Sequence, residues 1–331
     1  VMITDRARVC EPAIVLPQLV ALLAATALAA APAPAAVPCA TGLVCPDHLY
    51  VDPEGAAPDQ VREHRAQGRE AEAAALERIA GQPQPLWVGG SADDVADAVV
   101  PYLERARAAG ARPLLVGYSI PGRDCGAGYS GGGVSDGAAY RAWASAFAEA
   151  LRGSGAIVVL EPDAIPHALQ GSCDRDADER FALLADATAK LADAGAAVYI
   201  DAGHPSFTGD VEATADALRR SGVDRAAGFS LNVSYFASTE ANVEYGTAIS
   251  ALLGGTHFVI DTSRNGAPDE PDGWCNPPGR RIGEPPTLDP GIPLVDALLW
   301  IKRPGESDGD CGGAPPAGQW YEEYALGLVG L

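Results

Sequence analysis

Acidic residues recur in this sequence directly after short apolar runs, where a buried strand would end. In the segment AIVVLEPDAIP (156–166), Glu161 and Asp163 follow such a run. Two carboxylic acids can cleave a glycosidic bond, because one protonates the leaving oxygen while the other attacks the sugar or activates a water molecule. The polar residues placed after apolar runs are Asp124, Glu161, Asp163, Asp201, His204, Asp261, Arg264, Glu306 and Asp308.

Aromatic residues accompany these positions, and their large apolar faces could pack against sugar rings. They are Trp87, Tyr118, Tyr235, Trp274 and Trp300. Other reaction types are disfavoured, because the sequence has no G-x-S-x-G nucleophile motif, no phosphate-binding Walker sequence and no cysteine placed beside a histidine. The residues therefore favour cleavage of a glycosidic bond.

Seven apolar runs, separated mostly by Ala-rich helical stretches, would position these side chains. The runs are PLWVGG (85–90), PLLVGYSI (113–120), AIVVLEPDA (156–164), AAVYIDAGH (196–204), GFSLNVS (228–234), THFVIDTS (256–263) and DALLWIK (296–302). Apolar strands that alternate with helices predict a parallel sheet covered on both faces. In a parallel α/β barrel the carboxyl ends of the strands converge on one face, where the active site lies. We expect a single catalytic domain at 37–331.

The residues before the first apolar run are expected to form two different structures. Residues 37–55 lack helical periodicity and could be closed by a Cys39–Cys45 disulfide, a pairing that the sequence leaves open. Residues 58–80 are rich in Ala, Glu and Arg and predict one helix.

The N-terminus resembles a secretory signal. Arg6 and Arg8 precede an apolar stretch at 13–30, and small residues of the kind that signal peptidase accepts follow it. We expect residues 1–36 to be removed and the mature protein to be secreted, with no membrane attachment. Six of the seven cysteines remain after cleavage, and an even number in an exported chain favours disulfides over a metal site.

Charge limits the partners of this chain of 331 residues. Its formal net charge is −21, which would repel nucleic acid and anionic membranes. A neutral polymer is a better partner, and we expect a monomer that needs no cofactor and no metal.

Six blocks in order make the chain resemble glycoside hydrolase family 6, which contains secreted endo-β-1,4-glucanases and cellobiohydrolases. The blocks are YSIPGRDCGAGYSGGG (118–133), VVLEPDAIP (158–166), YIDAGH (199–204), HFVIDTSRNG (257–266), WCNPPGRRIG (274–283) and LLWIKRPGESDG (298–309). The resemblance extends from about Tyr50 to Leu328. It implies a distorted seven-stranded α/β barrel and an inverting mechanism.

The resemblance also implies roles for individual residues. Asp163 matches the general acid, Asp124 matches the residue that supports it, and Asp308 matches the family's candidate for the base. The implied substrate-binding residues are Tyr118, Trp87, Asp201, Ser234, Trp274, Lys302 and Glu306. The implied disulfides are Cys125–Cys173 and Cys275–Cys311, and the glycine-rich segment 126–133 is expected to be a flap in which Tyr129 and Ser130 close over the substrate.

Physical chemistry gives two further expectations for these carboxylates. The acid must be protonated at working pH, so burial and the neighbouring charge of Asp124 should raise the pKa of Asp163. An inverting enzyme also needs room for a water molecule, so Asp163 and Asp308 should stand about 6.5–9.5 Å apart.

Several other positions have a structural interpretation. We expect Glu161 to brace the strand end through a salt bridge or backbone hydrogen bonds, and Trp300 to lie in the core. Asp261 and Arg264 are expected to pair with each other. His204 is expected to orient a neighbouring loop through a hydrogen bond.

The connections after the last two strands are short, which favours an open cleft and attack within the β-glucan chain. An exo-acting cellobiohydrolase is the alternative. A non-catalytic glycan-binding protein would be expected to lack the acid, and a metal-dependent hydrolase would need more than the five histidines present.

Overall fold

A computed structural model describes residues 37–43, 45–126, 129–172 and 176–331, and residues 34–331 form one compact unit. The expected signal at 1–36 lies outside the described residues. No helix in the described part of the chain is both long and apolar enough to cross a lipid bilayer.

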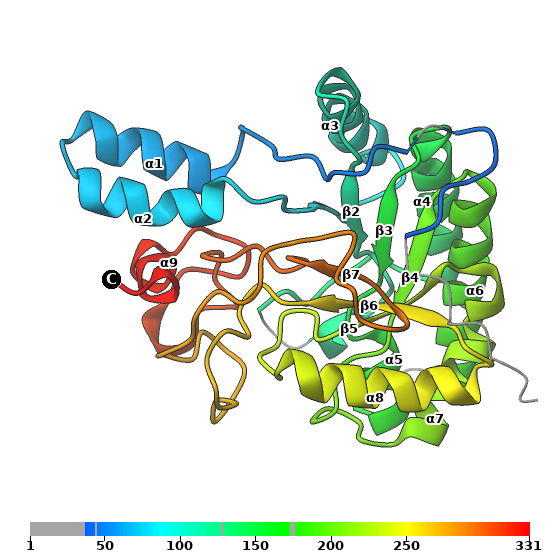
Figure 1. The fold of residues 1–331 in the computed structure, drawn as a ribbon. Coiled ribbons are helices and arrows are strands. Elements are labelled where there is room, and N and C mark those ends of the chain that lie inside the picture. The colour runs from blue at the N-terminus through cyan, green and yellow to red at the C-terminus, as the bar shows by residue number, and fades with distance from the viewer. Residues whose placement is uncertain (1–36, 44, 127–128, 173–175) are drawn as a thin grey trace, which may run out of the picture. The chain divides into compact units, whose positions relative to one another are not determined.

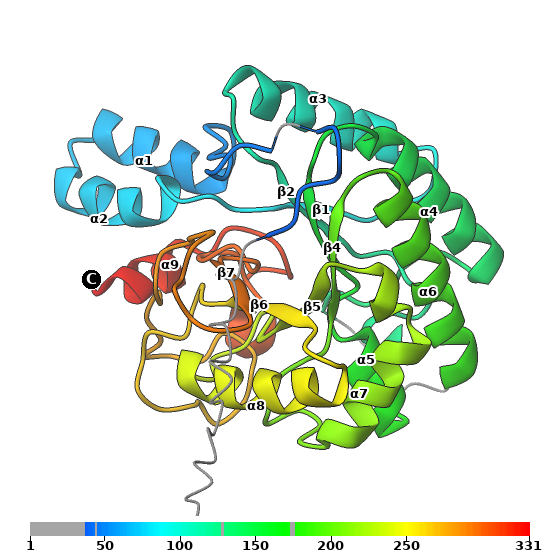
Figure 2. The ribbon, with the colours of Figure 1, turned by 45° about the vertical axis from the view of Figure 1, so that its right-hand side comes forward.

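The centre of this unit is one sheet of seven parallel strands that lie in sequence order. Six strands fall within predicted apolar runs and the last strand begins one residue before its run, so the predicted α/β fold is confirmed. The sheet curls without pairing its two edge strands and forms part of a barrel (Figure 2). The strands are β1 (Leu86–Val88), β2 (Leu114–Gly117), β3 (Ile157–Leu160), β4 (Ala197–Asp201), β5 (Gly228–Leu231), β6 (His257–Asp261) and β7 (Val295–Leu299).

Helices between the strands cover the convex side of the sheet (Figures 1 and 2). The helices are α3 (Val95–Ala108), α4 (Gly137–Leu151), α5 (Ala164–Gln170), α6 (Ala177–Asp193), α7 (Val211–Arg220) and α8 (Thr239–Leu252). Most of these helices also pack side by side, with α4 between α3 and α6, and with α7 against α8. Short 3₁₀ turns are η1 (Asp124–Gly126), η2 (Val223–Arg225) and η3 (Cys311–Gly313).

Alternate residues of each strand face two different apolar layers. In β3, Val158 and Leu160 pack toward the helices, whereas Ile157 and Val159 face the inside of the barrel. This alternation follows from the two-residue period of a β-strand. Because both layers are apolar, the strands are apolar throughout, which is why they appear in the sequence as continuous runs.

Side chains rather than an eighth strand connect β1 to the residues after β7. The indole N–H of Trp87 donates to the carbonyl of Ile301 (3.0 Å), and Arg303 donates to the carbonyl of Pro85 (2.8 Å). Trp300, expected in the core, is buried.

The single helix predicted at 58–80 is wrong in one respect, because the chain forms two helices there. These are α1 (Ala56–Ala66) and α2 (Glu70–Ala80), separated by Gly68 in the left-handed region (φ 73°). Glycine tolerates this conformation, which ends one helix and lets the chain reverse. Helix α2 packs against α9 (Glu322–Val329) (Figure 1). Leu76 and Ile79 are buried in the apolar cluster that α1, α2 and α9 share.

The segment before α1 is attached to the amino end of the sheet. A Cys39–Cys45 disulfide closes it, which settles the pairing that the sequence left open. The buried Arg112 donates to the carbonyls of Val37, Pro38 and Gly155.

Candidate active site

The acidic residues predicted to converge do so at the carboxyl edge of the sheet. Asp124 begins η1 after β2, and Asp163 directly precedes α5 after β3. Asp201 ends β4, and Asp308 follows β7. They form two groups. We call Asp124, Asp163 and Asp201 the acid-side cluster, and Asp308, Arg264 and Lys302 the ion-paired cluster.

Asp163 is placed by a sharp turn at the end of β3. Both Glu161 (φ 51°) and Asp163 (φ 66°) adopt the left-handed conformation on either side of Pro162, and the backbone N–H of Asp163 donates to Asp201 (2.8 Å). Within the described chain no hydrogen bond reaches the Asp163 carboxyl. Burial, then the charges of Asp201 and Asp124, raise the pKa of Asp163 well above that of an ordinary aspartate. The expected direction of the shift is confirmed, with Asp201 as an additional cause.

Glu161 braces this turn against the loop after β2, which confirms its predicted structural role. Its fully buried carboxylate accepts the backbone N–H groups of Ser119 (2.9 Å) and Ile120 (3.1 Å). Burial raises the pKa of Glu161 to about 7, although these hydrogen bonds oppose the rise. Because the same loop leads to Asp124, Glu161 links the positions of Asp124 and Asp163.

Asp124 is held by two hydroxyl groups. Tyr118 donates to its Oδ2 atom (2.7 Å), and Ser130 from the glycine-rich segment donates to the same atom. Its other oxygen, Oδ1, lies 4.0 Å from Nε2 of His167. The sequence analysis missed His167. Its spacing of four residues from Asp163 at the start of a helix is the signal that could have identified it.

In the ion-paired cluster, Asp308 is surrounded by positive groups. Arg264 donates to Oδ2 (2.7 Å), Lys302 lies 3.1 Å from Oδ1, and the backbone N–H of Asn276 donates to Oδ2 (3.0 Å). Burial alone would raise the pKa of Asp308, but the two cations outweigh it and lower the pKa. The Asp163–Asp308 separation of about 6.5–9.5 Å stays a prediction.

The predicted pairing of Asp261 with Arg264 is wrong. Arg264 bonds to Asp308 instead, and its second nitrogen donates to the carbonyl of Ser234 (2.5 Å). Asp261 points to backbone groups after β5, β6 and β7, and it accepts the N–H groups of Ser234, Ser263, Ile301 and Lys302. It therefore braces three loops, as Glu161 does on the acid side.

The aromatic candidates lie in different surroundings. Trp87 is half-buried and meets Tyr118 edge to face (ring centres 5.3 Å apart). Trp274 is exposed and meets Tyr129 in the same way (5.1 Å). A Cβ atom on Gly309 would lie 1.8 Å from the Tyr129 ring, so glycine there allows this tyrosine to approach the loop after β7. Tyr129 thus connects the glycine-rich segment to two other loops.

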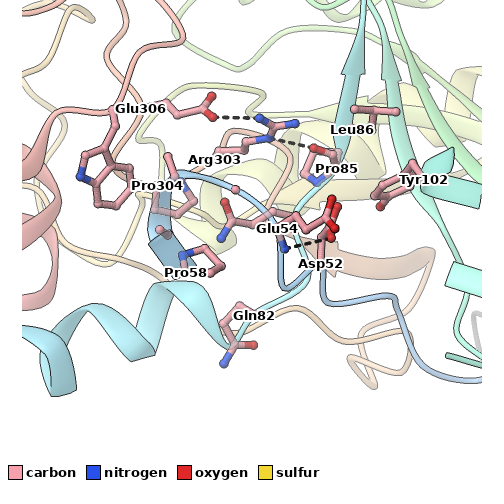
Figure 3. Close-up of a pocket in the computed structure, with 15 residues that line it drawn as sticks. Asp52, Glu54, Pro58, Gln82, Pro85, Leu86, Tyr102, Arg303, Pro304 and Glu306 are labelled. Atoms are coloured by element: carbon pink, nitrogen blue, oxygen red, sulfur yellow. Dashed lines mark hydrogen bonds and ion pairs between the residues drawn. The ribbon is translucent and has the colours of Figure 1, made fainter. Parts of the chain in front are cut away.

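Glu306 makes its described contacts with residues other than Asp308. It forms an ion pair with Arg303 (2.9 Å) and lines a pocket with Asp52, Glu54 and Tyr102 (Figure 3). Lys302, by contrast, is buried and bonded to Asp308. The sugar-binding roles of both residues stay predictions, as do those of Trp87, Trp274, Tyr118, Asp201 and Ser234.

His204 orients its neighbourhood by ring stacking rather than through the expected side-chain hydrogen bond. Its ring lies 3.4 Å from that of Tyr235 and nearly parallel to it. In the described part of the chain its buried Nδ1 atom has no hydrogen-bond partner, and burial lowers the pKa of His204 to about 3.

A disulfide joins the loops on either side of the ion-paired cluster. The predicted Cys275–Cys311 bridge is present, and the neighbouring Asn276 exchanges hydrogen bonds with Asp308. For the predicted Cys125–Cys173 bridge, Cys173 lies outside the described residues, so that pairing stays a prediction.

Three described side chains, Asp124, Asp163 and His167, have ligand atoms within 4.8 Å of one another. Exposed acidic groups at this spacing are common in proteins that bind no ion, so the spacing by itself does not identify a metal site.

Comparison with known proteins gives one consistent family. The model of glycosyl hydrolases family 6 matches residues 45–330. Endoglucanase A of Cellulomonas fimi is 47% identical over 77% of this chain and 56% of its own length, so the chain spans about half of that relative. A probable exoglucanase of Podospora anserina is 33% identical over 71% of this chain and 64% of its own length. The structure of an endoglucanase from Mycobacterium tuberculosis, in complex with methyl-cellobiosyl-4-deoxy-4-thio-β-D-cellobioside, is similar with a TM-score of 0.79 and 46% identity, covering 86% of this chain and 96% of that one.

Proposed function

The chain belongs to family 6 of the glycosyl hydrolases, and we propose that it is a secreted endo-β-1,4-glucanase that cleaves internal bonds of cellulose or related β-glucans with inversion. The observation that carries this proposal is the acid-side cluster. A carboxyl group whose pKa is raised by burial and by two carboxylate neighbours is suited to hold its proton to a higher pH than an ordinary aspartate.

In the proposed reaction Asp163 gives its proton to the glycosidic oxygen as the bond to the anomeric carbon breaks. A water molecule attacks that carbon from the opposite face, and a second carboxylate takes a proton from the water. The product then carries the inverted anomeric configuration.

Two carboxylates are candidates for the group that accepts the proton from water. Asp308 stays ionised because Arg264 and Lys302 lower its pKa, but the same cations reduce its affinity for a proton. Asp124 is the alternative, since Ser130 and Tyr118 connect it to the glycine-rich segment. Rescue of an alanine variant by azide, which replaces the attacking water, would identify the base, because only loss of the base is compensated in this way.

Endo action is proposed because the endoglucanases of C. fimi and M. tuberculosis share 46–47% identity with this chain. Exo action is the second candidate, favoured by the contact of Tyr129 with Trp274 between two loops and by the P. anserina exoglucanase. An endo-acting enzyme lowers the viscosity of carboxymethyl cellulose early, before much reducing sugar has formed. A slow loss of viscosity would favour exo action.

Secretion is proposed from the resemblance of 1–36 to a signal. The Cys39–Cys45 and Cys275–Cys311 disulfides support it, because such bonds persist in oxidising compartments.

The central test is hydrolysis of a cello-oligosaccharide by the wild-type enzyme and by Asp163→Ala, with the product followed by NMR. We expect the α-anomer to appear first from the wild type and activity to be lost in the variant. A β-anomer product, or an active variant, would contradict the mechanism.

A further inference from the structure

His167 lies beside the acid-side cluster and has no part in the reaction described above. It stands one helical turn after Asp163, and its backbone N–H donates to the carbonyl of Asp163 (3.0 Å). Residues four apart on a helix share a face, so the imidazole returns to the side of the carboxylates. Its Nε2 atom is 4.0 Å from Oδ1 of Asp124.

The other ring nitrogen of His167 is held from behind by Ser172. The Ser172 hydroxyl lies 3.3 Å from Nδ1 and 3.3 Å from the carbonyl of His167, so a hydrogen bond can join Nδ1 to Ser172. The Phe207 ring meets the imidazole edge to face (5.4 Å). This arrangement leaves Nε2 as the nitrogen that faces Asp124.

We propose that His167 is a positioning residue of the acid–base pair, which on protonation forms an ion pair with Asp124 and keeps that carboxylate ionised as the pH falls. The inference rests on the proposed hydrolase function, in which Asp124 acts beside the acid. An ionised Asp124 remains able to accept hydrogen bonds from Tyr118 and Ser130, so the ion pair extends activity toward acidic pH.

The charged groups around the ring set the pH range in which the ion pair forms. In the described part of the chain these groups are Asp124 from η1, Arg180 from α6 and Asp163 at the start of α5. Burial lowers the pKa of His167, Asp124 opposes this and Arg180 adds to it. The ring is therefore neutral at neutral pH and becomes charged only in acid. Its side chain is 20% exposed, so it can take up the proton directly from water.

The first test measures this coupling without turnover. The chain has five histidines, so the His167 ring can be followed by NMR in a pH titration and assigned by its absence in His167→Gln. In Asp124→Asn we expect the pKa of His167 to fall by about 0.5–1 unit, since a charge at about 4 Å in a partly exposed site has an effect of this order. An unchanged titration would overturn the proposal, and it would do so whether or not the protein hydrolyses β-glucan.

The second test compares the pH profiles of kcat/KM for wild type and His167→Gln. We expect the acid limb of the variant to lie about 0.5–1 pH unit higher, because glutamine can donate a hydrogen bond but cannot become charged. His48→Gln is the matched control, because His48 is exposed and also lies beside an aspartate, Asp47. Superimposable profiles for wild type and His167→Gln would overturn the proposal.

Discussion

The acid-side cluster and the ion-paired cluster use the same residue type at the same edge of one sheet, yet the pKa values of Asp163 and Asp308 shift in opposite directions. Asp163 has carboxylate neighbours, and burial together with their charge raises its pKa. Asp308 is also buried, but Arg264 and Lys302 lower its pKa. The comparison teaches that burial alone does not assign an acid or a base, because the sign of the neighbouring charge decides the direction.

The largest expected effect is on the acid side. Asp163→Asn should lower kcat about 10³-fold on a cello-oligosaccharide, because the amide cannot give a proton to the leaving oxygen. An aryl cellobioside with an acidic phenol should lose far less, since that leaving group departs without protonation. Steady-state kinetics on both substrates measure the difference. Equal losses on the two would show that Asp163 is not the acid.

The next effect is on the free energy of unfolding, and it should differ between the two clusters. Asp308→Asn leaves Arg264 and Lys302 buried without their counter-charge and should cost about 3–5 kcal/mol in the free energy of unfolding at neutral pH. Asp163→Asn should not destabilise the protein, because it removes a carboxyl that its neighbours repel. Urea unfolding of both variants measures the contrast, and equal destabilisation would remove the distinction between the clusters.

The pH dependence of these stabilities sharpens the same contrast. The folded-state pKa of Asp163 is raised. Its contribution to the free energy of unfolding is therefore present below the unfolded pKa of about 3.9 and is lost as the pH rises. The folded-state pKa of Asp308 is lowered. Its contribution to the free energy of unfolding is therefore present above the unfolded pKa of about 3.9 and is lost as the pH falls. Unfolding curves recorded across pH should therefore show the wild type converging with Asp308→Asn in acid.

The smallest expected effect concerns Asp201, a neighbour of the proposed acid Asp163. Asp201→Asn removes a charge that helps to raise the pKa of Asp163, so the alkaline limb of kcat should move about one unit toward lower pH. The pH profile measures it, with Glu212→Gln, a carboxylate in the first turn of α7, as the control. An alkaline limb that stays in place would mean that the charge of Asp201 does not contribute to the raised pKa of Asp163.

The fold could be predicted because its signal is local, since each strand is a continuous apolar run. Asp163 was matched to the acid through the resemblance to glycoside hydrolase family 6. Gly68 also marks the break between the two helices in the sequence. The helical pattern of the residues on both sides nevertheless favoured one continuous helix. Glu161 was correctly predicted to brace the strand end, since two carboxylates two residues apart cannot flank a sugar bond.

The partners of buried charges could not be predicted in the same way. Arg264 is three residues from Asp261 but bonds to Asp308, which is 44 residues away in sequence. His167 was overlooked because a lone histidine in a short helix carries no motif, and its significance depends on Asp124 from another strand.

By itself the sequence determined the order of the strands and the edge at which the polar residues gather, and its resemblance to glycoside hydrolase family 6 implied Asp163 as the acid. Only the tertiary structure decided that Asp201 adds to the raised pKa of Asp163, that Arg264 and Lys302 lower the pKa of Asp308, and that His167 stands beside Asp124. The physical reason is that strand formation depends on the pattern of neighbouring residues, whereas a pKa depends on burial and charge contributed by segments far apart in the chain.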